Sequence, residues 1–259
     1  MKNKFKKILL SNLILCSVCS CSPEVNNKLH GLYVIESDSK TNVGFQFDGN
    51  GKVKYSDEGF GYFFTKDDSL IICSDNEIFR FKIQKNKIIS VSENNKKETW
   101  VKKNAIIPNN RINDAKAKNT ATLLNEYYEI MTDNLSNDFS GNDKKTIHQK
   151  NKLIQLCDQG LSQACMAHFG ILLIDDQLLR TNPNAKKTAQ TENSAIVALG
   201  NKIISQGEPK GYSLLGIYYQ IIGNKKKAIQ QYKLGAENGD KTASLELINI
   251  QKQDNSDSN

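Results

Sequence analysis

The stretch "GYSLLGIYYQIIGNKKKAIQQYKLGAENGDKTASLEL", residues 211–247, decides the fold of the C-terminal half of this 259-residue chain. One pattern occurs at each end of this region, because "QGEPKGYSLLG" at 206–216 aligns with "NGDKTASLELI" at 238–248 and sets Gly207 over Gly239. "QGLSQACMAHF" adds a third copy, with Gly160 at the same place. A repeat with a period in the range of about 20–50 residues, with glycine at the turn and small residues where helices cross, is typical of stacked antiparallel helix pairs. The sequence therefore predicts an array of helices.

The same stretch resembles the Sel1-like repeat, a relative of the tetratricopeptide repeat. The matching positions are Leu215, Gly216, Tyr219, Gly223, Ala228, Tyr232, Gly235, Ala236, Gly239, Ala243 and Leu247. Gly211 departs from the family, which has Ala there. The resemblance implies an α-solenoid of helix hairpins that presents a concave surface to a protein partner. Tyr212 and Tyr218, on the first helix of a pair, are the candidate contacts, unless they belong to the core.

A polar insertion, "RTNPNAKKTAQTEN" at residues 180–193, makes the spacing from Gly160 to Gly207 longer than the spacing from Gly207 to Gly239. We expect a protruding loop there. Either it forms a variable contact surface or it is a tolerated change of length, and the sequence leaves both open.

Cys157 and Cys165 have seven residues between them in "CDQGLSQAC", at the end of one predicted helix and early in the next. Across a tight helix–turn–helix the two Cβ atoms can come within reach of a disulfide, which persists in an oxidising compartment. The spacing also resembles the cysteine-rich secreted branch of the Sel1-like family, in which it staples a helical hairpin. A redox-active pair is the alternative, although the C-x-x-C spacing is missing.

Before the helices, residues 29–103 alternate apolar and polar side chains, as in "VGFQFD" and "IFRFKIQ". This period of two, with turn residues between the runs, predicts about eight short strands in a small antiparallel meander or barrel. The expected strands are 31–36, 42–48, 52–56, 60–65, 69–73, 78–84, 87–92 and 97–102.

The β domain weakly resembles the small lipocalin-like domains of secreted lipoproteins, on the segments "LHGLYVIES", "FQFDGNGKV" and "ETWVKK". That resemblance implies a possible ligand cavity, lined by Phe45, Phe47, Phe79 and Phe81. The alternative, which short strands favour, is an interior filled by the barrel's own side chains.

The remaining segments complete the expected domain organisation. Pro108 and several asparagines mark a linker at 104–113, and a first helix follows from about Asp114 to Leu135. We assign the helical repeat domain to 114–251 and a disordered tail to 252–259. The predicted fold class is therefore α+β multidomain, with an antiparallel β barrel followed by a solenoid of Sel1-like hairpins.

The N-terminus has four lysines within seven residues, then a short apolar stretch and small residues, the pattern of a secretory signal. Around Cys21 it resembles the bacterial lipoprotein cleavage box, with Val18 at −3 and Ser20 at −1. The resemblance implies that residues 1–20 are removed, that Cys21 carries the lipid, and that 21–28 form a tether. Ser22 after the cysteine implies the outer membrane, with the protein facing the periplasm. An ordinary cleaved signal is the alternative.

Removal of residues 1–20 lowers the formal net charge from +7 to +3, because four lysines and no acids leave. A nucleic-acid partner consequently loses its main support. The two short lysine runs that remain are typical of solvated turns and helix starts.

The sequence offers few residues for chemistry. His30, His148 and His168 fall in different predicted elements and have no metal-ligand spacing, and we expect no metal, no cofactor and no catalytic residue. Asp175 and Asp176 are either a cation site or an acidic pair in a solvated turn. We expect a non-enzymatic envelope lipoprotein that binds a protein partner, as a scaffold or as an inhibitor or immunity protein. The alternatives are a small-ligand or lipid carrier using the barrel and, third, a cell-wall-directed or β-lactam-binding enzyme.

Overall fold

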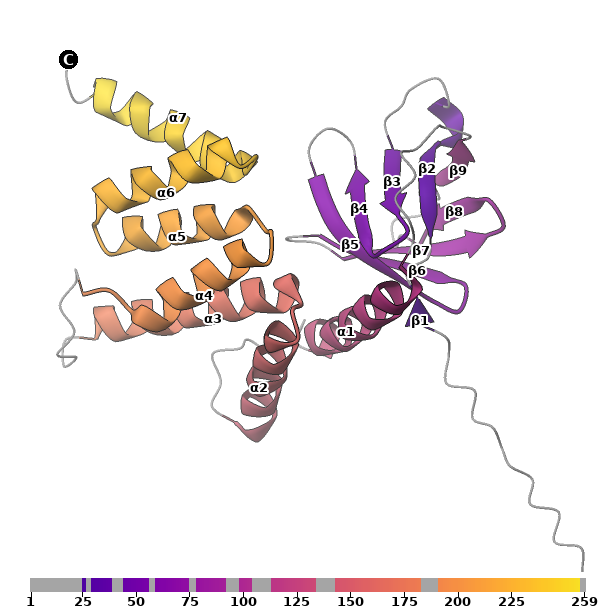
Figure 1. Cartoon of the computed structure of the whole chain (residues 1–259), viewed down its shortest axis with the longest axis horizontal. Helices are drawn as coiled ribbons and strands as arrows, with labels where there is room; N and C mark the ends of the chain where they lie inside the picture. The colour runs from indigo at the N-terminus through magenta and orange to yellow at the C-terminus, as the bar shows by residue number, and fades with distance from the viewer. Residues whose placement is uncertain are drawn as a thin grey trace, which may run out of the picture.

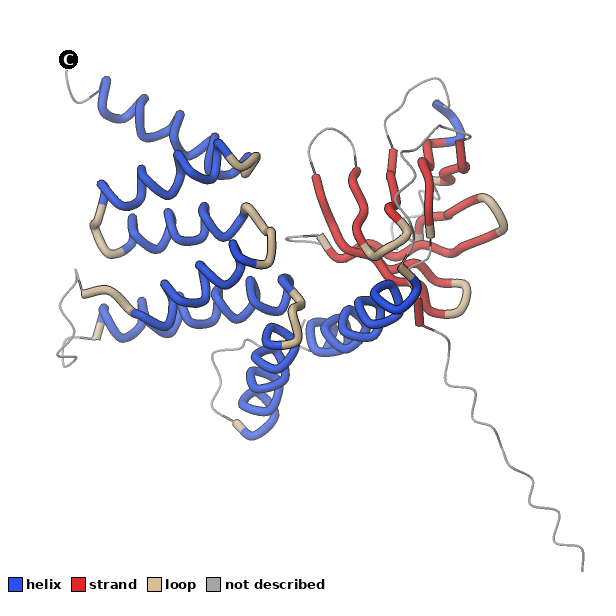
Figure 2. The backbone as a smooth tube through the Cα atoms, viewed as in Figure 1, coloured by secondary structure: helices blue, strands red, loops and turns tan. Residues whose placement is uncertain are grey.

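The computed structural model describes residues 25–26, 29–38, 44–55, 59–74, 78–91, 98–103, 113–133, 143–182 and 191–256. The predicted signal at 1–20, Cys21 and almost all of the linker at 104–113 lie outside these ranges. The described chain is an α+β protein, in which an antiparallel β barrel is followed by helices (Figures 1 and 2).

The barrel consists of eight strands, in the neighbour order β5-β4-β3-β2-β9-β8-β7-β6, and it closes where β6 pairs with β5. Every pairing is antiparallel, so the expectation of an eight-stranded antiparallel barrel is confirmed. The strand bounds are β2 His30–Ile35, β3 Gly44–Asp48, β4 Lys52–Tyr55, β5 Gly59–Lys66, β6 Ser69–Cys73, β7 Ile78–Gln84, β8 Lys87–Ser90 and β9 Thr99–Lys103. A short 3-10 helix, η1, covers Glu36–Asp38.

A further strand, β1 at Val25–Asn26, lies within the segment expected to be only a tether. This strand pairs with β5, with Val25 opposite Lys66. Strand β4 pairs with β5 only as far as Tyr62, so the rest of that edge of β5 is free to accept β1. The tether expectation is therefore wrong for these two residues, because unpaired backbone groups at the end of β5 accept a partner strand.

Apolar side chains fill the space inside the barrel. Phe47, Phe63 and Ile88 are fully buried, and the rings of Phe45, Phe81 and other aromatic residues meet edge to face. The Phe81 and Trp100 centroids, for example, lie 5.2 Å apart. This packing favours the filled interior over a ligand cavity.

Helix α1, Asp114–Asp133, packs on the outside of the barrel and not only on the other helices. Phe64, which points outward where its neighbour Phe63 points inward, meets the ring of Tyr128 at 5.9 Å. Cys73 on the same outer face is a buried free thiol whose pKa burial raises to about 12, as expected for an inert cysteine. The first helix of the expected helical domain 114–251 thus packs against the barrel as well as against α2.

In the described part of the chain six further helices follow, each packed against the next (Figure 1). Their bounds are α2 Lys144–Asp158, α3 Ser162–Thr181, α4 Ser194–Ser205, α5 Lys210–Ile221, α6 Lys225–Glu237 and α7 Lys241–Ser256. The helix α7 continues through Ser256, so the tail expected at 252–259 is helical over most of its length.

The same turn closes four of these helices. At Gly160, Gly207, Gly223 and Gly239 the backbone has a positive φ, which glycine adopts without the Cβ penalty of other residues. In each case the residue after the glycine donates its N–H to the carbonyl five residues earlier, as Glu208 does to Ile203. This is the Schellman motif, and it explains the repeated glycines in the sequence.

Small residues lie where the helices cross. A Cβ placed on Gly216 of α5 would lie 2.3 Å from the Tyr232 ring of α6, and one on Gly235 would lie 2.6 Å from the Cβ of Ala243 on α7. These glycines allow the axes of neighbouring helices to approach closely.

No helix in the described part of the chain has both the length and the apolar character needed to cross a membrane.

Candidate functional site

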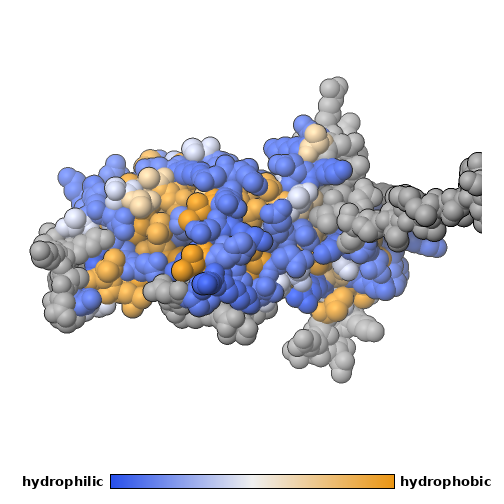
Figure 3. All heavy atoms as spheres, turned by 90° about the horizontal axis from the view of Figure 1, so that it is seen from below, coloured by the Kyte–Doolittle hydropathy of each residue, from blue (hydrophilic) through white to orange (hydrophobic). Residues whose placement is uncertain are grey.

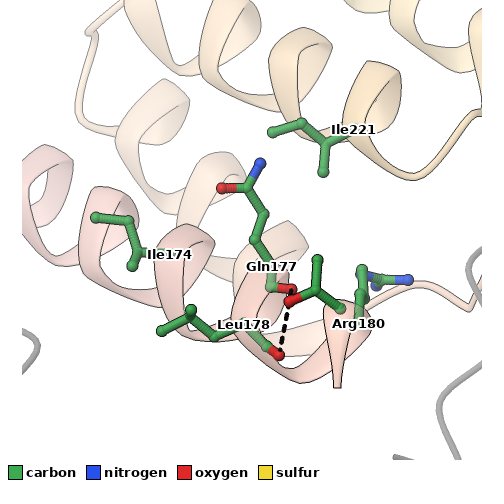
Figure 4. A pocket seen from close by; sticks show the side chains of 6 residues that line it. Ile174, Gln177, Leu178, Arg180 and Ile221 are labelled. Carbon is green, nitrogen blue, oxygen red and sulfur yellow. Dashed lines mark hydrogen bonds between the residues drawn. The ribbon is translucent and has the colours of Figure 1, made fainter. Parts of the chain in front are cut away.

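A groove of about 500 Å³ opens between the C-terminal part of α3 and the end of α5 (Figure 4). The apolar residues Ile174, Leu178 and Ile221 line it, together with the polar residues Gln177, Arg180 and Thr181. In Figure 4 the Gln177 side chain reaches from α3 toward Ile221. The Thr181 hydroxyl donates a hydrogen bond to the Leu178 carbonyl, at 3.1 Å. The polar groups of the groove are thus partly satisfied within α3.

The groove follows from unequal helix lengths. The helix α3 has 20 residues and α5 has 12, so the last turns of α3 extend past the cover of α5. Ile174 is half exposed and Leu178 is 58% exposed, although both are large and apolar. An exposed apolar group beside a hollow marks a candidate binding surface.

The repeat brings two equivalent isoleucines to this groove. Ile174 stands at the same offset from the turn glycine Gly160 as Ile221 does from Gly207. They occupy the same position in successive copies, and stacking places them in one lining. Such recurrence of one position along a surface is the geometry by which helical repeats present a binding face.

A buried polar network supports the rear of the groove. The carboxylate of Asp176 accepts hydrogen bonds from Arg180 Nε at 2.5 Å and from Asn193 Nδ2 at 2.9 Å. The guanidinium of Arg180 also donates to the Thr191 carbonyl at 2.6 Å. Asn193 in turn caps α4 through Ala195 N, at 3.1 Å. The network fixes the start of α4 against α3.

This network corrects two expectations from the sequence. Asp176 lies within α3 and is buried, and Asp175 lies 3.7 Å from Lys150 of α2, so the pair is neither a cation site nor a solvated turn. The insertion at 180–193 does not protrude as a whole, because its first two residues end α3 and Asn193 belongs to the network. Residues 183–190 of the insertion lie outside the described ranges.

Of the two tyrosines expected to contact a partner, only Tyr218 lies in the interior of the helical array. Tyr218 is fully buried, and its hydroxyl accepts the backbone N–H of Asn193. Tyr212 is half-buried, with its Cβ beside Gly235 of α6. The expectation is wrong for Tyr218, because α5 is enclosed by α3, α4 and α6 and has little free surface.

Cys157 and Cys165 come together at the turn between α2 and α3, with their sulfur atoms 2.11 Å apart. Both residues are buried, and the Gln206 amide at the end of α4 donates to the Cys157 carbonyl at 3.4 Å. The disulfide thus joins α2 to α3 where α4 also packs. Its position at a helix turn is consistent with a structural role.

Most large apolar side chains that are exposed in the described chain belong to the helices. The barrel contributes Phe60 and Val91, whereas the helices contribute Ile147, Ile154, Ile174, Leu178, Leu179, Leu245 and Ile248. Figure 3 shows apolar surface over the helical part of the molecule, seen from below. The helical part is therefore the better candidate for an interaction surface.

The three histidines stay apart, on β2, α2 and α3. Burial lowers the pKa of the half-buried His168 imidazole. Within the described ranges, no group of three or more His, Cys, Asp or Glu side chains could hold a metal ion.

Two signals in the sequence could have located the groove. Asp176 and Arg180 are spaced i, i+4 in an apolar helix, the spacing of a helical ion pair. The equal offsets from the turn glycines Gly160 and Gly207 also pair Ile174 with Ile221.

Comparison of the chain with protein-family models, with curated proteins and with solved structures gives no match.

Proposed function

We propose that this chain is a non-catalytic lipoprotein of the bacterial cell envelope that binds a protein partner through its helical array. Cys21 carries the lipid anchor, in the outer membrane and facing the periplasm. The helices are a solenoid of Sel1-like hairpins, and the partner is held as by a scaffold or by an inhibitor or immunity protein.

One observation carries this proposal. The groove between α3 and α5 is lined by two isoleucines from equivalent repeat positions, with Leu178 exposed beside them. An apolar lining with a few polar groups, here Gln177 and Thr181, suits an apolar segment of a partner, such as one face of an amphipathic helix. The Asp176–Arg180 pair holds the wall of the groove in place before binding.

The leading alternative is a carrier that holds a small ligand or lipid in the barrel. It requires free space where the rings of Phe45, Phe47, Phe81 and Trp100 meet one another. The mutual packing of these rings favours partner binding by the helices over the carrier function.

Site-specific photo-crosslinking in cells tests the proposal. A benzophenone amino acid replaces Leu178 in the groove or, as the matched control, Leu179, its neighbour on α3, which is 51% exposed and is not part of the groove lining. We expect a discrete crosslinked protein from position 178 and not from 179, and its loss when Ile174→Asp is added. The same products from both positions, or no product from 178, would contradict the proposal.

A further inference from the structure

The outer side of α7 carries a row of exposed side chains with a lysine at each end. Lys241, Leu245, Ile248 and Lys252 follow one another at intervals of four, three and four residues. At about 3.6 residues per turn, these positions lie within an arc of about 60° around the helix axis. All four residues are exposed, Leu245 at 62% and Ile248 at 47%. We call this row the outer stripe of α7.

The outer stripe lies opposite the side by which α7 joins the array. Ala243 and Ile250 are buried in the helical core, and α7 packs against α6. These two residues stand about 180° around the helix axis from the outer stripe. Figure 1 shows α7 as the outermost helix of the array. The outer stripe is therefore the face that α7 turns away from the other helices.

In the preceding repeat a helix covers the same positions. The repeat alignment sets Ser213, Gly216 and Gln220 of α5 over Leu245, Ile248 and Lys252 of α7. Ser213 and Gly216 are buried, and a Cβ on Gly216 would lie 2.3 Å from the Tyr232 ring of α6. The Gln220 side chain accepts a hydrogen bond from the Tyr232 hydroxyl, at 2.6 Å. The face of α5 that corresponds to the outer stripe thus receives α6, and one more step of the same stacking would place a helix on the outer stripe.

The side chains of the outer stripe define the kind of helix that fits it. On α5 a glycine receives the large Tyr232 ring, whereas α7 has the large Ile248 at the equivalent position. A helix that crosses α7 there packs closely if it has small residues opposite Ile248. Leu245 and Ile248 require an apolar face on that helix. The two lysines are about 16 Å apart along the axis and favour acidic side chains at both ends of the apolar face.

The same lysines disfavour a second copy of the chain on the outer stripe. In an antiparallel pair of α7 helices with Leu245 opposite Ile248, Lys241 of each copy would face Lys252 of the other copy. In a parallel pair each lysine would face its own counterpart. Like charges meet in both arrangements, which opposes association. The outer stripe therefore suits a helix of a different protein.

We propose that the outer stripe of α7 binds an amphipathic helix of another protein, whose apolar face has small residues at its centre and acidic side chains at both ends. The outer stripe faces away from α6, whereas the groove lies between α3 and α5. It is thus a second binding surface, separate from the groove. An array with two such surfaces holds two proteins together, as a scaffold does.

Photo-crosslinking in cells with the full-length chain tests this proposal. A benzophenone amino acid replaces Asn249, an exposed residue beside the outer stripe, or, as the matched control, Gln230, an exposed residue of α6. Mass spectrometry identifies the captured segment. We expect a discrete product from position 249 and none from 230. The captured segment should be an amphipathic helix with acidic residues about three turns apart, and Ile248→Asp should abolish its capture.

Charge reversal tests recognition by the two lysines. A synthetic peptide of the captured segment should bind Lys241→Glu/Lys252→Glu at least tenfold more weakly than the wild type. The same peptide with lysines in place of its acidic residues should regain affinity for that variant. The equal charge change Lys226→Glu/Lys233→Glu, at exposed positions of α6, should alter the affinity less than twofold.

The opposite outcomes contradict the proposal. A product that joins two copies of the chain would assign the outer stripe to self-association. No product from position 249, or equal products from 249 and 230, would show that no helix binds there. A captured segment without the two acidic residues would overturn recognition by charge. The groove is judged separately, because Ile248→Asp should leave any product from position 178 unchanged.

Discussion

The hydroxyl of Tyr62, on β5, donates a hydrogen bond to Glu208 Oε1 in the turn between α4 and α5. The ammonium group of Lys52, on β4, lies 3.3 Å from the same oxygen and 5.3 Å from the centre of the Tyr62 ring. Barrel and helical array are therefore joined by a partly buried carboxylate as well as by α1. Glu208 stands in the sequence where the next repeat has Asp240, which caps α7.

A double-mutant cycle with Tyr62→Phe and Glu208→Gln measures this contact. A hydrogen bond to a charged group contributes about 1.5–3 kcal/mol, and we expect a coupling in that range from denaturant unfolding. The control is a cycle on Lys66 and Glu129, an exposed pair between barrel and α1, which should give less than about 1 kcal/mol. Equal coupling energies in the two cycles would refute the inter-domain role of Glu208.

Gly216→Ala should destabilise the array. The new Cβ would lie 2.3 Å from the Tyr232 ring, and overpacking of this kind costs about 1–3 kcal/mol, more than alanine's gain in helix propensity. Gly170→Ala is the control, because nothing lies within 4 Å of a Cβ at that position in α3. It should be neutral or raise the free energy of unfolding by up to about 1 kcal/mol. Equal effects of both substitutions would show that the close α5–α6 approach is not required.

Arg180→Met should lower the free energy of unfolding by about 3–5 kcal/mol, because the buried carboxylate of Asp176 then loses its guanidinium partner. The double variant Asp176→Asn/Arg180→Met should recover part of that loss, since the buried negative charge is removed as well. Urea unfolding of the three proteins checks both statements. A single variant within about 1 kcal/mol of the wild type would contradict the buried-pair interpretation.

Reduction of the Cys157–Cys165 disulfide should lower stability by about 2.5 kcal/mol, the chain-entropy value for so short a loop. Unfolding with and without dithiothreitol measures the difference, and Cys157→Ala/Cys165→Ala is the control that should not respond to the reductant. Cys73 is buried and should remain unreactive toward alkylating reagents in the folded protein. An unchanged unfolding curve on reduction would rule out a stabilising disulfide.

The sequence was sufficient for elements whose signal is local. Alternation of side chains and the turn residues between the runs located all eight barrel strands, although β5 and β6 are buried on both faces. The turn glycines located the helix pairs, because a positive φ is needed at each Schellman turn.

What the sequence could not supply depends on contacts between distant segments. The two residues of β1 form a strand only because β5 has a free edge. The burial of Tyr218 arises from helices on several sides of α5, which helical periodicity does not report. The groove likewise depends on α3 extending past α5. The ends of these two helices, Thr181 and Ile221, are distant in the sequence, so local patterns do not show how far one extends past the other.

The most direct test of partner binding is the affinity of the anchored protein for the partner captured at position 178, measured for Ile174→Asp and for Ile248→Asp. The two isoleucines are almost equally exposed, at 50% and 47%, but only Ile174 lines the groove. We predict at least a 100-fold loss of affinity for Ile174→Asp, since a buried unpaired carboxylate opposes binding, and less than a twofold change for Ile248→Asp. Equal affinities of the two variants would show that the groove between α3 and α5 is not the binding site.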